Sequence, residues 1–417
     1  MGINRRGWGG IKTGGGPAGV KAPPSRIGSS LGDLIRLIEE RLPLPGRFRP
    51  RLPGGVAELS RLLTRARDER EGGYLNRPDL LSAYLRYFLP WNVFRLLKLF
   101  EISPLPALSA GDALTDIGSG PLTLPIALWI AFPGFRSLAL EFRCIDKSAA
   151  ALEAGRRLFA ALSGGREGGS GPEGSLPVSW KIRTIHGSPG IPIRGKKARL
   201  VSAVNLFNEI RAAPEKAVRA AALLDSLGAK DGGILVMEPG NPQGGAFIAA
   251  LRAALLERGR LPAAPCVHAG SCPMPGIVMP GAARGKPKWC HFTFDTAEVP
   301  PALHELSRAA GIPKERAAFS FLLTGPGAGS AERPGNPPRI RVVSGSFPVG
   351  RGWGRYGCSE RGLVLVTGSK PRLDSAPSGT LLDPGFSGKE RKDPKTGAPV
   401  IPLPEPEDDP SAAKRRN

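Results

Sequence analysis

The sequence lacks any long apolar segment. No run reaches the roughly 18 uncharged apolar residues that a membrane-spanning helix needs. The longest apolar stretch, from Pro121 to Phe135, is interrupted by Pro125 and Pro133. The N-terminal part shows no hydrophobic region of the secretory kind, so we expect neither a membrane protein nor a secreted one.

Cysteine is also scarce, with five residues in a chain of 417. That number is too small for a disulfide scaffold, and a reducing compartment is the expected environment. Cysteines that cluster in such a compartment indicate a metal site or catalysis. Acidic residues are absent before Asp33, which favours either a disordered RNA-touching arm or a mitochondrial transit peptide. We predict a cytoplasmic protein, with the mitochondrial matrix as the alternative.

What the sequence does contain is glycine, proline and positive charge. The 56 glycines and 44 prolines predict long loops, while 41% apolar residues suffice for a sizeable core. Lys and Arg number 58 against 36 Asp and Glu, which gives a net charge of +22. Charge of this size, spread through the body of the chain, favours a nucleic-acid partner over a basic protein without one. No long basic amphipathic helix with an aromatic face supports a membrane-surface protein.

Composition and periodicity divide the chain into five segments. Residues 1–30 are expected to form a disordered basic arm, and apolar residues at helical spacing predict a helical module over 31–105. Strand and helix patterns alternate over 106–260, which is typical of a parallel, doubly wound α/β sheet. Residues 261–370 are predicted to form a smaller β-rich element that carries most of the cysteines. The stretch 371–417 is expected to be a disordered tail.

A glycine loop follows the first predicted strand of the α/β domain. Asp116, Gly118 and Gly120 lie between that strand and a helix, and Asp146 ends the second strand. Glycines at such a turn let the backbone approach a ligand, and the second acid can accept hydrogen bonds from a ribose diol. These spacings resemble those of class I S-adenosylmethionine-dependent methyltransferases. Dinucleotide binding is the competing use of the same geometry, but Leu122 stands where its third glycine would follow; a loop that merely makes a turn is the other alternative.

Other strand ends are expected to face the same crevice. They are His186 to Pro189, Asn205 to Glu209, and Glu238 to Gly240. Asn208 and Glu209 are the candidates for the catalytic position near a methyl acceptor. The sequence shows neither an Asp/Asn-Pro-Pro-Tyr motif nor a catalytic cysteine for carbon-5 methylation. Cys144 lies inside a predicted strand and is interpreted as a buried structural thiol.

The remaining cysteines form a constellation. They are Cys266, Cys272, Cys290 and Cys358, the last of which is expected in a loop just before the final predicted strand. Four thiolates complete either a tetrahedral zinc site or one cubane iron–sulfur cluster, and the residues alone leave both open. His268 or His291 could replace one thiolate around zinc, although a role beside the ligands or near phosphate is favoured for both. Pro265 and Pro273 stiffen the loop that carries the first two thiols.

These motifs together resemble a family of methyltransferase-like proteins of the small ribosomal subunit, found in mitochondria and bacteria. The resemblance covers about residues 50–370. It rests on APCVHAGSCP, on WCHF, on a late single cysteine, and on the segment YLNRPDLLSAYLRYFLPWNVF ahead of the DIGSGP loop. It implies a class I methyltransferase-like (Rossmann-like) fold with an N-terminal helical module and a small C-terminal β-rich metal-binding element.

The resemblance also implies a function. The four matching cysteines would hold a [4Fe–4S] cluster, with zinc as the alternative, and Asp116, Gly118, Gly120 and Asp146 would hold S-adenosylmethionine. Expected partners are ribosomal RNA and the small ribosomal subunit, in support of subunit assembly and translation, with a monomer away from the ribosome. The rival functions are an active rRNA methyltransferase and a zinc-stabilised RNA-binding module without catalysis.

Overall fold

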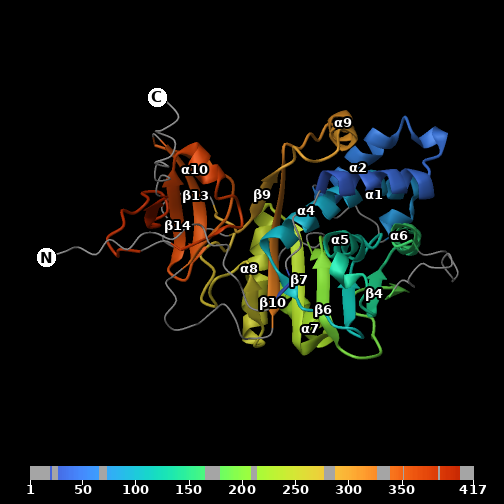
Figure 1. Cartoon of the computed structure of the whole chain (residues 1–417), viewed down its shortest axis with the longest axis horizontal. Helices are drawn as coiled ribbons and strands as arrows, with labels where there is room; N and C mark the ends of the chain where they lie inside the picture. Colours follow the sequence, from blue (N-terminus) through green and yellow to red (C-terminus); the bar gives the residue numbers. More distant parts are fainter. Residues whose placement is uncertain are drawn as a thin grey trace, which may run out of the picture.

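The computed structural model describes residues 19–20, 27–64, 73–164, 179–207, 214–276, 287–325, 339–350, 352–383 and 386–403. Most of the predicted basic arm over 1–30 lies outside these ranges. The described part is elongated, with a large α/β body and a smaller β-rich part at one end of the long axis (Figure 1).

The N-terminal module is helical, as its apolar spacing predicted. In α1, the buried residues Leu31, Leu34 and Ile38 recur at helical spacing, so one face packs on the body of the molecule. The chain from α3 to α4 is continuous, but the five residues of η4 form a π-helical turn just before Pro90, whose missing N–H interrupts the hydrogen-bond ladder. The elements are α1 (Ile27–Arg41), η1 (Gly46–Phe48), α2 (Leu52–Thr64), η3 (Tyr74–Asn76), α3 (Pro78–Ala83), η4 (Tyr84–Phe88) and α4 (Leu89–Ile102).

The body is built on one mixed sheet with the strand order β5-β4-β3-β6-β7-β10-β8, and β9 pairs with β10. Strands β5, β4, β3, β6 and β7 are parallel, whereas β10 runs antiparallel to both β7 and β8. The strands are β3 (Ala113–Ile117), β4 (Leu140–Asp146), β5 (Trp180–His186), β6 (Ala198–Val204), β7 (Gly228–Pro239), β8 (Leu261–Ala264), β9 (Phe292–Asp295) and β10 (Arg316–Gly325). A doubly wound sheet with one antiparallel strand inserted near its edge is the arrangement of the class I methyltransferase-like fold, so this part of the predicted fold class is confirmed.

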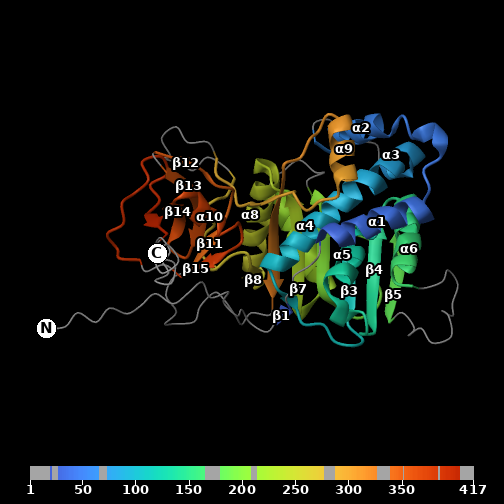
Figure 2. The same ribbon diagram turned by 45° about the horizontal axis from the view of Figure 1, so that its top comes forward.

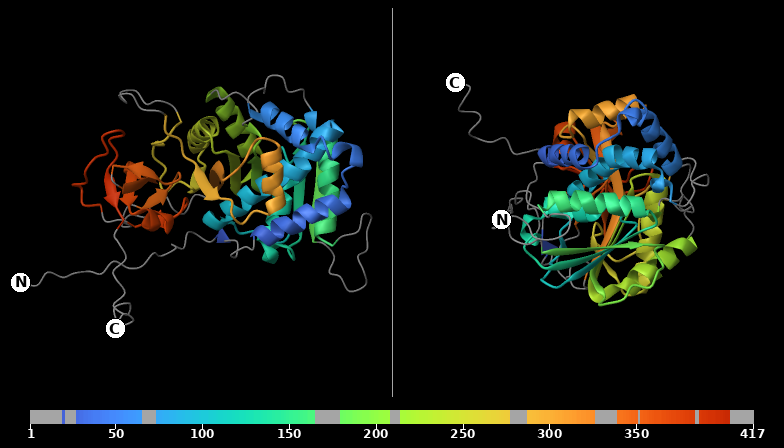
Figure 3. Two further views of the ribbon diagram at one scale, coloured as in Figure 1. Left: turned by 90° about the horizontal axis from the view of Figure 1, so that it is seen from above. Right: turned by 90° about the vertical axis from the view of Figure 1, so that its right-hand side faces the viewer.

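Helices cover both faces of this sheet (Figure 3). One face carries α5 (Thr123–Ala131) and α6 (Ala149–Leu162) under the N-terminal module, and the other carries α7 (Pro214–Leu227) and α8 (Pro242–Glu257). The short α9 (Pro301–Ala309) lies beside the N-terminal helices (Figure 2). None of the described helices combines the length and the apolar character that crossing a membrane requires.

The β-rich part is a second sheet with the order β15-β11-β13-β14-β16, and β12 pairs with β13. Figure 1 shows this second sheet next to α8 and β9. Its elements are β11 (Ile340–Val342), β12 (Phe347–Val349), β13 (Gly352–Ser359), β14 (Gly362–Gly368), α10 (Lys370–Asp374), β15 (Leu381–Leu382) and β16 (Val400–Pro402). A separate two-residue pairing joins β1 (Gly19–Val20) to β2 (Leu105–Pro106).

Three sequence expectations differ from the structure. Strand β10 was expected in the small C-terminal element, but it belongs to the main sheet, where its long apolar run is buried between β7 and β8. Cys358 was placed in a loop and lies instead in β13. The tail expected from residue 371 contains α10, β15 and β16 up to Pro402, because these short segments pair with the second sheet.

Candidate functional site

The glycine loop leaves β3 in a conformation that favours glycine. Gly118 and Gly120 have φ angles of 69° and 53°, in the left-handed region. The N–H groups of Gly118 and Ser119 both donate to the carbonyl oxygen of Ile145, at 2.9 and 3.0 Å. A Cβ atom on Gly118 would lie 2.8 Å from the Cδ1 atom of Leu206, which follows β6, so a side chain at position 118 would require Leu206 to move.

Asp146 ties this loop to the end of β4. Its Oδ2 atom accepts a hydrogen bond from the N–H of Gly120, and its Oδ1 atom accepts one from the N–H of Ser148, both at 2.8 Å. Burial raises the pKa of Asp146, and these two backbone donors counteract part of that rise. Each carboxylate oxygen keeps a further lone pair, so Asp146 can still accept a hydrogen bond from a ligand hydroxyl.

Asp116 lies beneath the loop rather than on the pocket surface. Its side chain is buried, and its Oδ1 atom accepts a hydrogen bond of 2.6 Å from the hydroxyl of Ser202 on β6. Burial raises the pKa of Asp116 to about 6, although the hydrogen bond from Ser202 acts to lower it. Asp116 therefore connects β3 to β6 directly below the turn.

Leu122 occupies the place where a third glycine was expected, and it adopts φ 57° and ψ 42° at the start of α5. A branched side chain in this left-handed region is strained. The neighbouring helix leaves space for this side chain at Gly155 on α6. A Cβ atom at position 155 would lie 2.4 Å from the backbone of Pro121 and 2.7 Å from the side chain of Leu122. The glycine that permits close packing is thus on α6 instead of in the loop.

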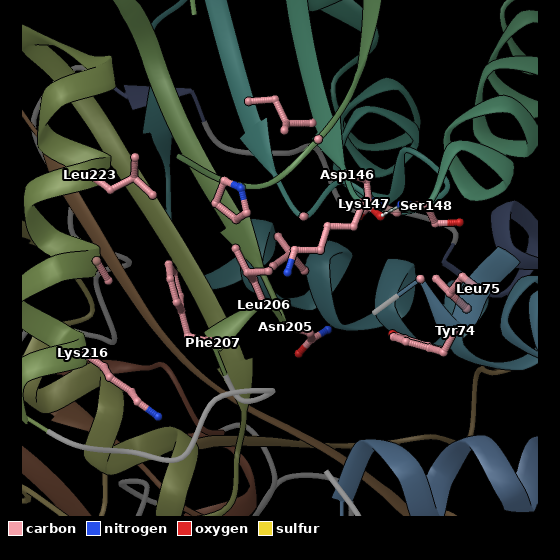
Figure 4. A pocket seen from close by; sticks show the side chains of 18 of the residues that line it. Tyr74, Leu75, Asp146, Lys147, Ser148, Asn205, Leu206, Phe207, Lys216 and Leu223 are labelled. Atoms are coloured by element: carbon pink, nitrogen blue, oxygen red, sulfur yellow. Dashed lines mark hydrogen bonds between the residues drawn. The ribbon is translucent and has the colours of Figure 1, made fainter. Parts of the chain in front are cut away.

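A pocket of about 640 Å³ opens in front of the loop. This is the usual size range of small-molecule sites, and the pocket lies where the strand order reverses between β3 and β6, at the carboxyl ends of the strands. Gly118, Gly120 and Asp146 line it, whereas Asp116 does not. In Figure 4, Asp146, Lys147 and Ser148 lie on one side of the pocket, and Lys216 and Leu223 of α7 lie on the other.

The helical module also contributes to this pocket, which the sequence analysis missed. Tyr74 and Leu75 from η3 and Tyr84 from η4 line it. Tyr84 additionally lies over the loop, since a Cβ on Gly120 would be 3.8 Å from its hydroxyl oxygen. Helical periodicity identified the module but contained no information about which of its faces meets the sheet.

The predicted catalytic candidates, Asn208 and Glu209, lie outside the described residues. Immediately before them, Asn205 has φ 56° and lines the pocket together with Phe207. The fully buried carboxylate of Glu238 accepts a hydrogen bond of 2.8 Å from the N–H of Phe207, which holds this strand end in place. The other predicted strand end contributes Gly187 and Pro189 to the pocket lining.

The four predicted metal ligands also come together. Cys266, Cys272, Cys290 and Cys358 line one cavity of about 30 Å³. The first follows β8 and the third precedes β9, both strands of the main sheet, whereas Cys358 lies in β13 of the second sheet. The cavity therefore lies at the junction of the two sheets. Cys144 is buried in β4 and is not among the residues that line it.

Each of these thiols is difficult to ionise without a bound cation. Burial raises the pKa of all four, and the neighbouring cysteines raise those of Cys272, Cys290 and Cys358 further. A metal reverses this preference because coordination deprotonates a thiol. By donor chemistry alone, four thiols from three separate stretches of chain around one cavity suit a thiolate-bound metal group.

Two histidines were alternatives as ligands. His268 lines the cavity, and its Nε2 atom lies 3.3 Å from the sulfur of Cys358. His291 does not line it, and its ring stacks on Trp289 instead. Within the described ranges, no group of three or more His, Cys, Asp and Glu side chains has the geometry to hold a metal ion.

The comparisons with known proteins point to one family. The family model "Mitochondrial small ribosomal subunit Rsm22" matches residues 196–346, from just before β6 to just after β11. This chain resembles the Rsm22 family. The matched stretch contains three of the four cavity cysteines and ends before Cys358. No curated protein sequence matches the chain.

Solved methyltransferase structures are also similar to it. A putative class I S-adenosylmethionine-dependent methyltransferase from Listeria monocytogenes shares 9% identity over 74% of this chain and 88% of its own, with a TM-score of 0.34. A methyltransferase from Geobacter sulfurreducens with bound S-adenosyl-L-homocysteine shares 14% over 57% and 91%, with a TM-score of 0.31. A third, from Pyrococcus furiosus, shares 9% over 40% and 71%, with a TM-score of 0.28.

Proposed function

We propose that this chain is a methyltransferase-like protein of the small ribosomal subunit, which binds S-adenosylmethionine and ribosomal RNA and supports subunit assembly and translation. The observation that carries the proposal is the glycine-loop pocket of about 640 Å³ at the switch point of a chain whose residues 196–346 match the Rsm22 family. The family description supports the ribosomal partner, and the pocket supports a small-molecule ligand.

In this proposal the pocket holds the nucleoside part of S-adenosylmethionine. Gly118 and Gly120 let the ligand approach the backbone, and Asp146 accepts hydrogen bonds from the ribose hydroxyls. Asp116 acts indirectly, by fixing the turn through Ser202. Asn208 and Glu209 remain the candidates for the position beside a methyl acceptor, because Asn205 and Phe207 of the same segment line the pocket.

The four-cysteine cavity is proposed to hold a [4Fe–4S] cluster through Cys266, Cys272, Cys290 and Cys358. One zinc ion is the rival, and it needs all four sulfurs about 2.3 Å from a single point. The four cysteines share one cavity, so either group would be held by the same side chains. The cluster is preferred because the cysteine pattern resembles that of the four-cysteine family; the thiol chemistry alone would suit zinc equally. When bound, such a group supplies a cross-link between loops that no hydrogen bond replaces.

The ribosomal partner agrees with the charge of the chain. A net charge of +22 favours binding to phosphates, in which Lys and Arg fix position through contacts that weaken as salt rises. The family description names the mitochondrial small subunit, which favours the mitochondrial matrix over the cytoplasm that the sequence analysis preferred.

Two binding experiments test the proposal. Isothermal titration of the anaerobically purified full chain with S-adenosylmethionine is expected to give a dissociation constant in the micromolar range. Sedimentation with purified small subunits is expected to place the chain in the subunit peak at low salt and to release it at high salt. Absence of both interactions would contradict the proposal.

Methyl transfer separates the proposed binding protein from the active-enzyme rival. The protein is incubated with labelled S-adenosylmethionine and immature small-subunit RNA, and label in the RNA is counted. Ribosome association and cofactor binding without label support the proposal as stated. Label that disappears in an Asn208→Ala variant supports the rRNA methyltransferase instead.

A further inference from the structure

The four-cysteine cavity is surrounded by cationic and hydrogen-bonding side chains. Arg252 projects from α8 and is only 4% exposed. Its Nε atom donates to the sulfur of Cys266 at 3.2 Å, and its Nη2 atom donates to the carbonyl oxygen of His268 at 2.7 Å. One guanidinium therefore holds both a predicted ligand and the loop that carries it.

Arg341 reaches the same cavity from β11 of the second sheet. Its Nε atom donates to the carbonyl oxygen of Pro265 at 3.1 Å, and its Nη1 atom donates to that of Gly379 at 2.6 Å. Among the described residues, no carboxylate forms an ion pair with Arg252 or Arg341. Arg252 is buried and Arg341 is half-buried, and positive charges withdrawn from water without acidic partners are costly unless something negative lies between them.

His268 completes the set on the side of Cys358. It is 7% exposed, and its Nε2 atom lies 3.3 Å from the Cys358 sulfur. A metal-bound thiolate carries no proton, so in a loaded site the imidazole N–H is the donor in this contact. We call Arg252, His268 and Arg341 the polar frame of the cavity.

The charges of frame and ligands match. Four thiolates around an oxidised [4Fe–4S] core carry a net charge of about −2, and Arg252 and Arg341 contribute two positive charges. The oxidised site is therefore neutral within its buried surroundings. One-electron reduction adds a negative charge, which the cations and the hydrogen bonds to sulfur stabilise.

We propose that the polar frame neutralises the four-thiolate centre and raises its reduction potential, with Arg252 and His268 donating hydrogen bonds to the sulfurs of Cys266 and Cys358. This inference rests on the cluster proposed above. It assigns a role to residues that are not ligands, and it makes α8 of the main domain part of a site that extends into the second sheet.

The test is the midpoint potential of the cluster in the anaerobically purified full chain, followed by optical spectroscopy during a redox titration. Arg252→Gln removes a charge and a sulfur hydrogen bond. We expect its reduction equilibrium to fall at least roughly tenfold, which for one electron is about 59 mV toward more negative potential. Arg341→Gln and His268→Asn are expected to shift the potential in the same direction.

A matched control distinguishes this effect from general loss of stability. Arg260 is also buried, at 7% exposed, and it forms an ion pair with Asp225. Arg260 precedes β8, whereas Cys266 follows this strand, so the two lie at opposite ends of it. Arg260→Gln is expected to lower the melting temperature and leave the potential unchanged. If Arg252→Gln fails to retain the cluster, the midpoint potential is measured in Arg252→Lys and Arg341→Gln instead. Arg252→Lys keeps the charge and changes the hydrogen-bond geometry, and both variants are expected to have a lower potential than the wild type.

The outcomes are separable. Potentials equal to wild type in Arg252→Gln, Arg341→Gln and His268→Asn, with the cluster retained, overturn the inference and leave the cluster proposal standing. A wild-type chain without iron overturns the cluster proposal and the inference with it. Neither result bears on the binding of S-adenosylmethionine, which titration measures separately.

Discussion

The glycine-loop pocket and the four-cysteine cavity differ in how their polar groups are satisfied. In the pocket, both oxygens of Asp146 already accept backbone hydrogen bonds, from Gly120 and Ser148. In the cavity, burial and mutual repulsion raise the pKa values of the thiols, and two arginines face them without carboxylate partners among the described residues.

The pocket is therefore built by the backbone, whereas the cavity, in the proposed function, depends on a bound metal group. The pocket keeps its shape through contacts within β3, β4 and β6, so a ligand there adds little to folding. The cavity joins two sheets through cysteines that become favourable thiolates only around a cation. Loss of the bound group should therefore destabilise the junction between the two sheets and leave the glycine-loop pocket unchanged.

The largest expected effect is the loss of a cavity cysteine. Cys266→Ser and Cys358→Ser are each expected to abolish metal binding and to lower the free energy of unfolding by roughly 4 kcal/mol or more, because metal binding is coupled to folding. Metal analysis and urea unfolding measure both quantities. Cys144→Ser, in the core away from the cavity, is the control and should keep its metal. Unchanged metal in both cavity variants would refute the ligand assignment.

The second effect concerns Asp116, whose pKa is raised to about 6 by burial. The folded state holds a proton there that the unfolded state loses near pH 4, so this group's contribution to stability falls as pH rises from about 4 to 6. Above about pH 6 the contribution of Asp116 to stability stays constant. A shift of about 2 units corresponds to roughly 3 kcal/mol. Urea unfolding at several pH values should show that Asp116→Asn lacks this decline, and an identical pH profile would show that the carboxyl ionises normally.

Gly155 tests whether α6 compensates for Leu122. Gly155→Ala places a Cβ 2.4 Å from the backbone of Pro121, which must move. The expected cost is about 2 kcal/mol in the free energy of unfolding, with weaker cofactor binding because the loop shifts. Gly134→Ala, at a glycine with nothing within 4 Å, is the control and should be neutral. Equal stability of the two variants would mean that the close contact is not required.

The smallest effect sharpens the claim that backbone contacts preform the pocket. Asp146→Asn puts an amide group opposite one of two backbone donors, and the affinity for S-adenosylmethionine should fall about tenfold, near 1.4 kcal/mol. Metal content should stay at the wild-type level. Asp112→Asn is the control, because Asp112 accepts from the N–H of Ser109 at the other end of β3. A large loss of metal in Asp146→Asn would mean that the two sites are not independent.

The parts of this structure that the sequence predicted are those with local patterns. Strands β3 and β4 ended in glycines and acids, and their carboxyl ends do meet at the pocket. The cysteines were grouped by residue chemistry, and three of them occur within 25 residues, so their convergence required few assumptions.

The parts that were missed depend on contacts between distant residues. A buried strand of the main sheet and a strand of a small antiparallel sheet have the same apolar pattern, so β10 was assigned to the wrong sheet. Tyr84 reaches the pocket through the packing of η4 on the body. Arg252 and Arg341 are ordinary basic residues in the sequence, and only the fold shows that both face the thiols.

The most direct test of the account is the iron, sulfide and zinc content of the anaerobically purified full chain. We expect about four iron and four sulfide per chain, with a brown colour from thiolate-bound iron. Zinc at one per chain in a colourless protein would contradict the cluster and leave a zinc-stabilised junction between the two sheets.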